Sequence, residues 1–238
     1  MTMNRRRFLS RAAAVSTAFA SLPILTAGAR RADGYVNEVE GYGALVPDPA
    51  GLFDLPEGFD YVAFSDTGED MDDGLLVPGD HDGMAAFPGP DGLVVLVRNH
   101  ELKAHETGLS AFGPNAERLG RIDASRLYDV TPQGLPHLGG TTTVHVDPVS
   151  RRVVRQFMSI AGTENNCAGG PTPWASWITC EETLTRAGEA GTKAHGYAFE
   201  VPSAATGLVD PVPLLSMGRF KREACAIDPR TSIVYQTE

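Results

Sequence analysis

The chain has 238 residues, with 30 acidic side chains against 20 basic ones and a net charge of −10 at pH 7. This acidic balance argues against a protein that holds nucleic acid by neutralising its phosphates, and it favours cations as partners. The 26 glycines and 17 prolines favour short strands and turns over long helices, and the length suits one substantial domain behind a leader.

Residues 1–29 have the pattern of a cleavable export leader. The segment Arg5-Arg6-Arg7-Phe8-Leu9 resembles the twin-arginine signal, which sends folded proteins across the bacterial inner membrane. The apolar run 12–25 is shorter than the ~20 residues that a spanning helix needs. Pro23 also interrupts it. We therefore expect the twin-arginine translocation machinery as a partner and no stable membrane anchor after cleavage. The mature domain, residues 30–238, is expected in the periplasm or outside the cell.

Short β-prone runs separated by turn residues predict an all-β fold. These runs are residues 93–97, 141–146, 153–157, 196–201, 225–227 and 233–235. Two of the turns between them are alike, because Asp147-Pro148 and Asp228-Pro229 occupy the same place in similar hairpins 81 residues apart. Asp can bond the turn backbone and Pro presets φ, so this pair is first a turn device. The recurrence suggests blades of a β-propeller, with a twisted β-sandwich as the alternative.

The last run, residues 233–238, is a strong strand that stops without a turn or a polar tail. Such an end leaves an unpaired strand edge. We therefore expect the chain to be a fragment of a longer reading frame, in which the propeller is incomplete.

Residues 165–183 place Cys167 and Cys180, adjacent Glu181 and Glu182, and both tryptophans in a stretch punctuated by Gly and Pro. Thiolate and carboxylate ligands together suit a transition metal beside a harder cation. We expect this loop to carry part of a metal site. Cys167 precedes Ala168-Gly169-Gly170, where the backbone can approach a metal closely, whereas Cys180 ends an apolar run and is expected in the core. With three cysteines, at least one is left without an intramolecular disulfide.

Other candidate ligands lie at the ends of predicted strands. Glu181 and Glu182 should point to opposite sides of a strand, so only one of them readily faces a given metal; Glu182 is favoured, and a solvated edge position suits Glu181. Glu101 follows an apolar strand, and Glu223 precedes one, where an unpaired carboxylate is costly. The histidines at 81, 105, 137, 145 and 195 form no metal-binding spacing and are expected to be structural or exposed.

Several segments, in this order, resemble the PhoX family of exported bacterial alkaline phosphatases. They are Gly41-Tyr42-Gly43 to Phe59, Met71-Asp72-Asp73-Gly74, Asp82-Gly83-Met84, Arg98-Asn99-His100-Glu101, Leu138-Gly139-Gly140-Thr141-Thr142, residues 165–183, His195-Gly196-Tyr197 and Gly218-Arg219-Phe220-Lys221-Arg222-Glu223-Ala224. The resemblance implies a six-bladed propeller-like fold that holds iron and calcium ions and hydrolyses phosphate esters.

The resemblance also implies roles for individual residues. Cys167 and Glu223 would hold iron, and the iron and calcium shells would be completed by Glu101, Glu182 or Glu181, and Glu238. Asn99 would lie near the substrate phosphate or a calcium. Family members usually have His-Glu where this chain has Arg222-Glu223; Arg222 would bind phosphate or lie on the surface, and activity could be altered.

The sequence thus predicts a monomeric, metal-dependent phosphate monoester hydrolase that uses Ca²⁺ and Fe³⁺. No Gly-x-Ser-x-Gly elbow and no phosphate-loop lysine motif is present, which disfavours a serine hydrolase and a nucleotide triphosphatase. Two alternatives are a calcium-dependent propeller hydrolase such as a lactonase and a non-catalytic exported propeller protein.

Overall fold

The computed structural model describes residues 41–238, so the predicted leader, residues 1–29, lies outside the described range. The chain divides into two compact units, Met1–Val62 and Ala63–Glu238, and each is treated by itself. None of the helices in residues 41–238 has the length and hydropathy that crossing a bilayer requires.

In the first unit, a small hairpin pairs β1 (Leu45–Val46) with β2 (Leu55–Pro56) in antiparallel fashion. Asp48 organises the loop between these strands. Its carboxylate accepts hydrogen bonds from the backbone N–H groups of Ala50, Leu52 and Phe53 and from the Tyr61 hydroxyl. The Tyr61 hydroxyl is the largest of the effects that lower the pKa of Asp48 to about 2.

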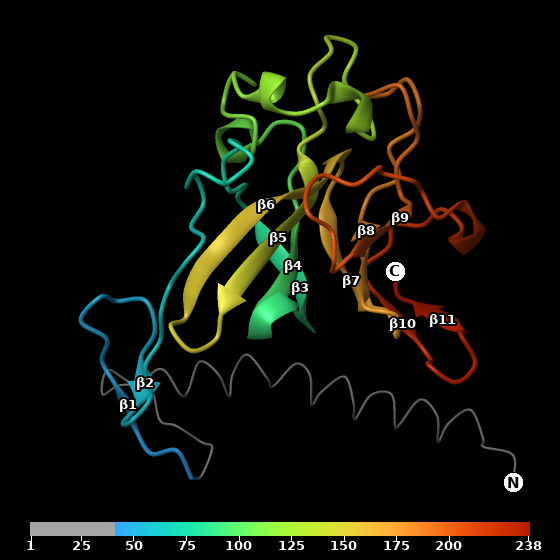
Figure 1. The fold of residues 1–238 in the computed structure, drawn as a ribbon. Coiled ribbons are helices and arrows are strands. Elements are labelled where there is room, and N and C mark those ends of the chain that lie inside the picture. Colours follow the sequence, from blue (N-terminus) through green and yellow to red (C-terminus); the bar gives the residue numbers. More distant parts are fainter. Residues whose placement is uncertain (1–40) are drawn as a thin grey trace, which may run out of the picture. The chain divides into compact units, whose positions relative to one another are not determined.

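The second unit is built from antiparallel sheets, which confirms the all-β expectation (Figure 1). A four-stranded sheet has the order β3 (His81–Pro88), β4 (Val94–His100), β5 (Gly139–Asp147) and β6 (Arg152–Thr163); a three-stranded sheet has the order β7 (Asn166–Pro171), β8 (Ser176–Glu181) and β9 (Ala198–Pro202); and β10 (Cys225–Ile227) pairs with β11 (Val234–Gln236). Helical structure within 41–238 is limited to single 3-10 turns at Pro90–Gly92, Thr107–Leu109, Leu119–Arg121, Ala124–Arg126 and Leu215–Met217.

The two Asp-Pro turns are built alike, as their sequences predict. In the β5–β6 turn, Asp147 accepts hydrogen bonds from the backbone N–H of Val149 and the hydroxyl of Ser150. In the β10–β11 turn, Asp228 accepts the equivalent bonds from Arg230 and Thr231. The aspartates are therefore turn residues in both hairpins, since each carboxylate satisfies groups of its own turn.

The four-stranded and three-stranded sheets share a hydrophobic core. Its buried members from β3 and β4 are Phe87, Val95 and Val97, and those from β8 and β9 are Trp177, Phe199 and Val201. Burial of large apolar side chains from both sheets fixes one sheet against the other. The described residues form no closed barrel and no closed propeller ring.

Residues 165–183 are not the loop that their Gly and Pro content suggested. They form the hairpin of β7 and β8, joined by a turn at 172–175. Gly169 and Gly170 serve close packing within this hairpin and beside it. An added Cβ would lie 1.8 Å from the Ile178 carbonyl oxygen at Gly169 and 2.0 Å from the Cys225 carbonyl oxygen at Gly170. Glycine is needed because any side chain would push these strands apart.

Candidate metal centre

Three of the predicted ligands converge near the start of β7, the end of β8 and the start of β10. The Cys167 sulfur and one carboxylate oxygen each from Glu182 and Glu223 all lie within 4.8 Å of one another. Cys167 lies on β7, Glu182 follows β8, and Glu223 precedes β10. Pairing of β7 with β8 brings two of these residues together, and the backbone of residues 222–223 lies against the Cys167 side chain.

The Cys167 thiol is buried, with 2% of the residue exposed. Its Sγ lies 3.3 Å from each of the backbone carbonyl oxygens of Arg222 and Glu223. Burial, together with the charges of Glu223 and two further carboxylates, raises the pKa of the Cys167 thiol to about 12. A thiolate at this position therefore needs a cation beside it, because neighbouring negative charges disfavour it.

Glu101 extends the group at the end of β4. Burial and hydrogen bonding to the neighbouring carboxyls of Asp82 and Glu182 raise the pKa of Glu101 to about 7. Gly83 lets β3 pack closely against β7, since an added Cβ there would lie 2.7 Å from the Ala168 Cα. Carboxyl groups packed in this way repel one another unless a proton or a cation neutralises them.

Asn165 holds the ends of two strands at this place. Its Nδ2 donates to Glu101 Oε1 at 3.0 Å and to the Glu182 backbone carbonyl at 3.2 Å. The residue has φ of 52°, in the left-handed region that Asn tolerates better than most residues. Asn165 is thus a positioning residue for two candidate ligands.

One cation in the described residues lies beside these carboxylates. Lys221 Nζ lies 2.9 Å from Glu182 Oε1, and its side chain is 58% exposed. The backbone N–H of Lys221 donates to Glu238 Oε1 at 3.3 Å, so the predicted ligand Glu238 lies at the Lys221 backbone and outside the set of Cys167, Glu182 and Glu223. Glu223 is exposed, so the expectation that it would be costly through burial is wrong. The site opens to solvent on the side of Lys221, Glu223 and Glu238.

This donor set fits a mixed metal centre. A thiol and carboxylates offer a soft ligand beside hard oxygen ligands, which are the preferences of a transition metal and of calcium respectively. Asp82, Glu101, Glu182 and Glu223 concentrate negative charge that Lys221 alone does not offset.

Asn99 lies in the protein interior, against the part of the β7 backbone that carries Cys167. Its Nδ2 donates to the backbone carbonyls of Cys167 and Ala168, and its Oδ1 accepts from Trp177 Nε1 at 2.8 Å. The residue is fully buried. These contacts support a role in fixing the β7 backbone around Cys167; contact of Asn99 with phosphate or calcium stays a prediction.

The surface position considered for Arg222 is wrong, because its side chain is fully buried. The guanidinium donates to the Gln236 side chain and to the backbone carbonyls of Gly196, Met217 and Gly218. It also lies over the Phe220 ring, 5.3 Å from its centroid. Because the guanidinium donates to these acceptors, the structure gives no support to the prediction that Arg222 binds phosphate. The same bonds fix the segment that carries Glu223.

Glu181 is absent from the thiolate group, and the solvated edge position suggested for it is wrong. It is fully buried and accepts hydrogen bonds from the backbone N–H groups of Glu164, Gly196 and Tyr197. It also accepts from His195 Nδ1 at 2.7 Å. The prediction that Glu181 and Glu182 face opposite sides is confirmed, with Glu182 on the side of Cys167.

The structure adds residues that sequence reasoning did not select, namely Asp82, Asn165 and Lys221. Each lies within or beside a segment already noted, but no spacing distinguishes it from a surface residue. Cys180 is confirmed as a core residue and packs with Cys225. All three cysteines are free thiols.

The fold and the site define an all-β protein with a thiolate–carboxylate group suited to metal ions. The sequence model of the family described as Alkaline phosphatase PhoX matches residues 40–154 and 138–238. The chain therefore belongs to the PhoX alkaline phosphatase family.

Among solved structures, the chain resembles Pseudomonas fluorescens PhoX in complex with vanadate, a transition state analogue. The two sequences are 16% identical, and the TM-score is 0.46. The match covers 72% of this chain and 41% of the Pseudomonas chain, so the protein spans less than half the length of that relative. A comparison with curated proteins gives no significant match.

Proposed function

We propose that this protein is a metal-dependent phosphate monoester hydrolase of the PhoX type. The observation that carries the proposal is the convergence of Cys167, Glu182 and Glu223 within 4.8 Å, in a chain that belongs to the PhoX family. Cys167 and Glu223 would hold Fe³⁺, while Glu101 and Glu182, with Asp82 and Glu238 beside them, would hold Ca²⁺. Bound there, the ions would neutralise phosphate charge and activate an oxygen nucleophile.

The protein's own residues would prepare this chemistry. Asn165 holds Glu101 close to the end of β8, and Asn99 fixes the backbone carbonyls of Cys167 and Ala168. The exposed ammonium of Lys221 can leave Glu182 to contact a phosphate oxygen when cations take over the carboxylate. A phosphate monoester carries the negative charge that such a set of cations favours.

We further propose that the antiparallel sheets are blades of a propeller-like fold and that the protein is exported by the twin-arginine pathway. The shared core between two sheets and the repeated Asp-Pro hairpin support the first statement. The leader sequence Arg5-Arg6-Arg7-Phe8-Leu9 supports the second. Folding before export suits a protein that takes up its metals in the cytoplasm.

The test is hydrolysis of p-nitrophenyl phosphate by the purified chain supplied with calcium and iron. We expect release of p-nitrophenol, loss of activity with a chelator, and little activity toward bis(p-nitrophenyl) phosphate. Cys167→Ala should abolish the activity, whereas Cys225→Ala, at another buried free thiol, should retain it. A metal-loaded chain that does not release p-nitrophenol would contradict the phosphatase function while leaving the metal centre standing.

A further inference from the structure

The proposed function does not use a second group of titratable side chains, which is separate from the thiolate centre of Cys167, Glu182 and Glu223. Asp129, His137 and His195 each offer one ligand atom, and these atoms lie within 4.8 Å of one another. All three residues are buried, with exposures of 3%, 0% and 0%. Distant parts of the chain supply them, since Asp129 and His195 are 66 residues apart.

The distances within this group match those around a small metal ion. His195 Nε2 lies 3.3 Å from Asp129 Oδ2, and His137 Nε2 lies 3.7 Å from the same oxygen. Ligands bound to zinc at about 2.0–2.1 Å in a tetrahedron are about 3.3 Å apart. The group is therefore close to the spacing of a tetrahedral site.

Hydrogen bonds fix which nitrogen of His195 faces Asp129. Glu181 Oε1 accepts from His195 Nδ1, and an ionised carboxylate can only accept, so the hydrogen of the ring lies on Nδ1. In the neutral ring, Nε2 then presents its lone pair to Asp129 Oδ2. Two acceptors at that distance need either a second ring proton or a metal ion between them. A carboxylate that holds the far nitrogen of a histidine is also the usual support of a metal-bound imidazole.

His137 gives an independent indication. Both of its ring nitrogens are buried and have no hydrogen-bond partner. A proton on His195 would satisfy Asp129 but would leave His137 unpaired, and a buried polar group without a partner costs about 1–3 kcal/mol. A metal ion would bind one nitrogen of each imidazole and an oxygen of the carboxylate at once.

The surroundings close this place from water. Asp129 is held by the backbone N–H groups of Thr192 and Lys193. Gly191 packs directly over the ligands, since an added Cβ would lie 2.1 Å from Asp129 Oδ2 and 2.5 Å from His137 Nε2. Glu164 is adjacent through its N–H bond to Glu181, and its Oε2 is buried without a partner.

We propose that Asp129, His137 and His195 form a second metal site that takes a borderline transition-metal ion such as Zn²⁺. Imidazole nitrogens and a carboxylate suit zinc, and a fully buried site without access for substrate is structural. Glu181 orients His195 from outside the ligand set. The site stabilises the contact between β8 and the segments around residues 129 and 137.

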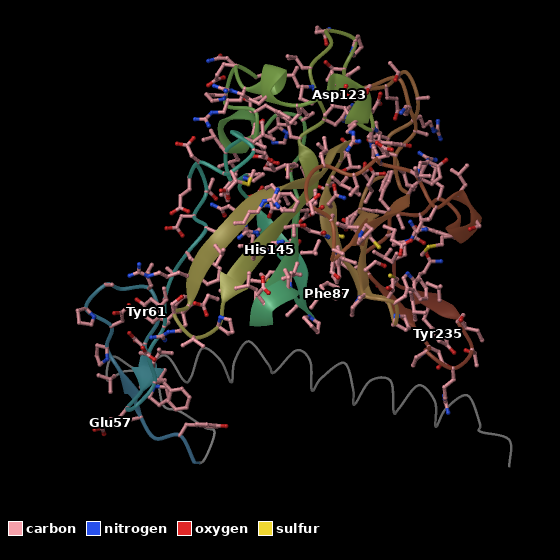
Figure 2. The ribbon with its side chains drawn as sticks, viewed as in Figure 1. Glu57, Tyr61, Phe87, Asp123, His145 and Tyr235 are labelled. Carbon is pink, nitrogen blue, oxygen red and sulfur yellow. The ribbon has the colours of Figure 1, made fainter. Side chains whose placement is uncertain are left out.

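The experiment uses the double variant Cys167→Ala, Glu223→Gln, which removes the thiolate centre and leaves the second group intact. Dialysed against zinc and then against buffer, this chain should retain one zinc per molecule by elemental analysis. His137→Gln in the same background should lose the zinc. His145→Gln should keep it, because His145 (Figure 2) lies on β5 with its ring beside Phe157.

A second measurement decides the matter if His137→Gln does not fold. Zinc X-ray absorption of the folded double variant should show only nitrogen and oxygen ligands at about 2.0–2.1 Å, with no sulfur at about 2.3 Å. Removal of zinc with a chelator should lower the melting temperature, and its return should restore it. Absence of stoichiometric zinc in the double variant, or a zinc shell that contains sulfur, would overturn the proposal.

Discussion

Glu181 and Glu182 are neighbours in the chain, yet their carboxylates belong to different groups. Glu181 accepts a hydrogen bond from His195 at 2.7 Å, whereas Glu182 lies 2.9 Å from the Lys221 ammonium and shares the group of Cys167. The end of β8 separates them because successive side chains of a strand point to opposite sides. One short segment thus links an open, acidic centre to a closed, buried one.

This separation predicts different effects for two matched substitutions. Glu181→Gln should lower the free energy of unfolding by about 3 kcal/mol, because an amide nitrogen would face buried N–H donors. Glu182→Gln should change it by no more than about 0.5 kcal/mol, since its ion pair is partly exposed, but should weaken metal binding. Denaturant unfolding of the two metal-free variants, beside a calcium titration, distinguishes them. Equal losses of stability would contradict the assignment.

Asn165 should affect metal affinity only by positioning the carboxylate of Glu101. Asn165→Gly keeps the backbone freedom that φ of 52° requires but removes the amide that bonds Glu101. Loss of such a supporting hydrogen bond typically costs about 10–100-fold in metal affinity. Ser232→Gly is the matched control, because Ser232 has φ of 58° in the β10–β11 turn. A calcium affinity unchanged in Asn165→Gly would remove Asn165 from the site.

Arg222 should matter to the fold more than to substrate binding. Arg222→Met leaves the carbonyl of Gly218 and the side-chain oxygen of Gln236 without their donor, and leaves the Met217 carbonyl with only the bond from Gln236 Nε2. We expect a loss of about 3 kcal/mol in the free energy of unfolding. Arg230→Met, at a side chain that is 88% exposed, should stay within about 0.5 kcal/mol. An Arg222→Met protein of full stability, with a raised KM for phosphate ester, would support phosphate binding instead.

The first unit provides a pH dependence that does not involve metal. The folded pKa of Asp48, about 2, lies below its ordinary value of 3.8, so the bonds of its carboxylate stabilise the loop above pH 3.8. That stabilisation is lost as the pH falls through about 2. The hydroxyl of Tyr61 is the largest cause, so Tyr61→Phe should raise the pKa of Asp48 toward 3.8. A carboxyl NMR titration measures this, and an unchanged pKa in Tyr61→Phe would exclude the hydroxyl.

Much of the β-structure could be predicted from local chemistry. The hairpins of β5–β6 and β10–β11 follow from alternating apolar runs around an Asp-Pro turn, whose bonds are all local. The Gly and Pro content of residues 165–183 predicts a loop, because Gly169 and Gly170 break a strand pattern, whereas the structure has the β7–β8 hairpin there. Their purpose, room for the Ile178 and Cys225 carbonyls, appears only when the strands are paired.

The site likewise contains residues that could be predicted from the sequence and residues that only the tertiary structure reveals. Cys167, Glu182 and Glu223 could be selected from residue type and resemblance, and the structure brings them together. Asp129, His137 and His195 could not, because no regular spacing connects them and only the tertiary fold makes them neighbours. Arg222 is a related case, since its acceptors are mostly backbone carbonyls that sequence does not reveal.

The measurement that tests the central claim most directly is the metal content of the purified chain after loading with iron and calcium and removal of unbound ions. We expect iron and calcium to remain bound in the original chain and in Cys225→Ala, and iron to be lost in Cys167→Ala. Iron that remains stoichiometric in Cys167→Ala, or an original chain that retains neither metal, would contradict a metal centre built on Cys167.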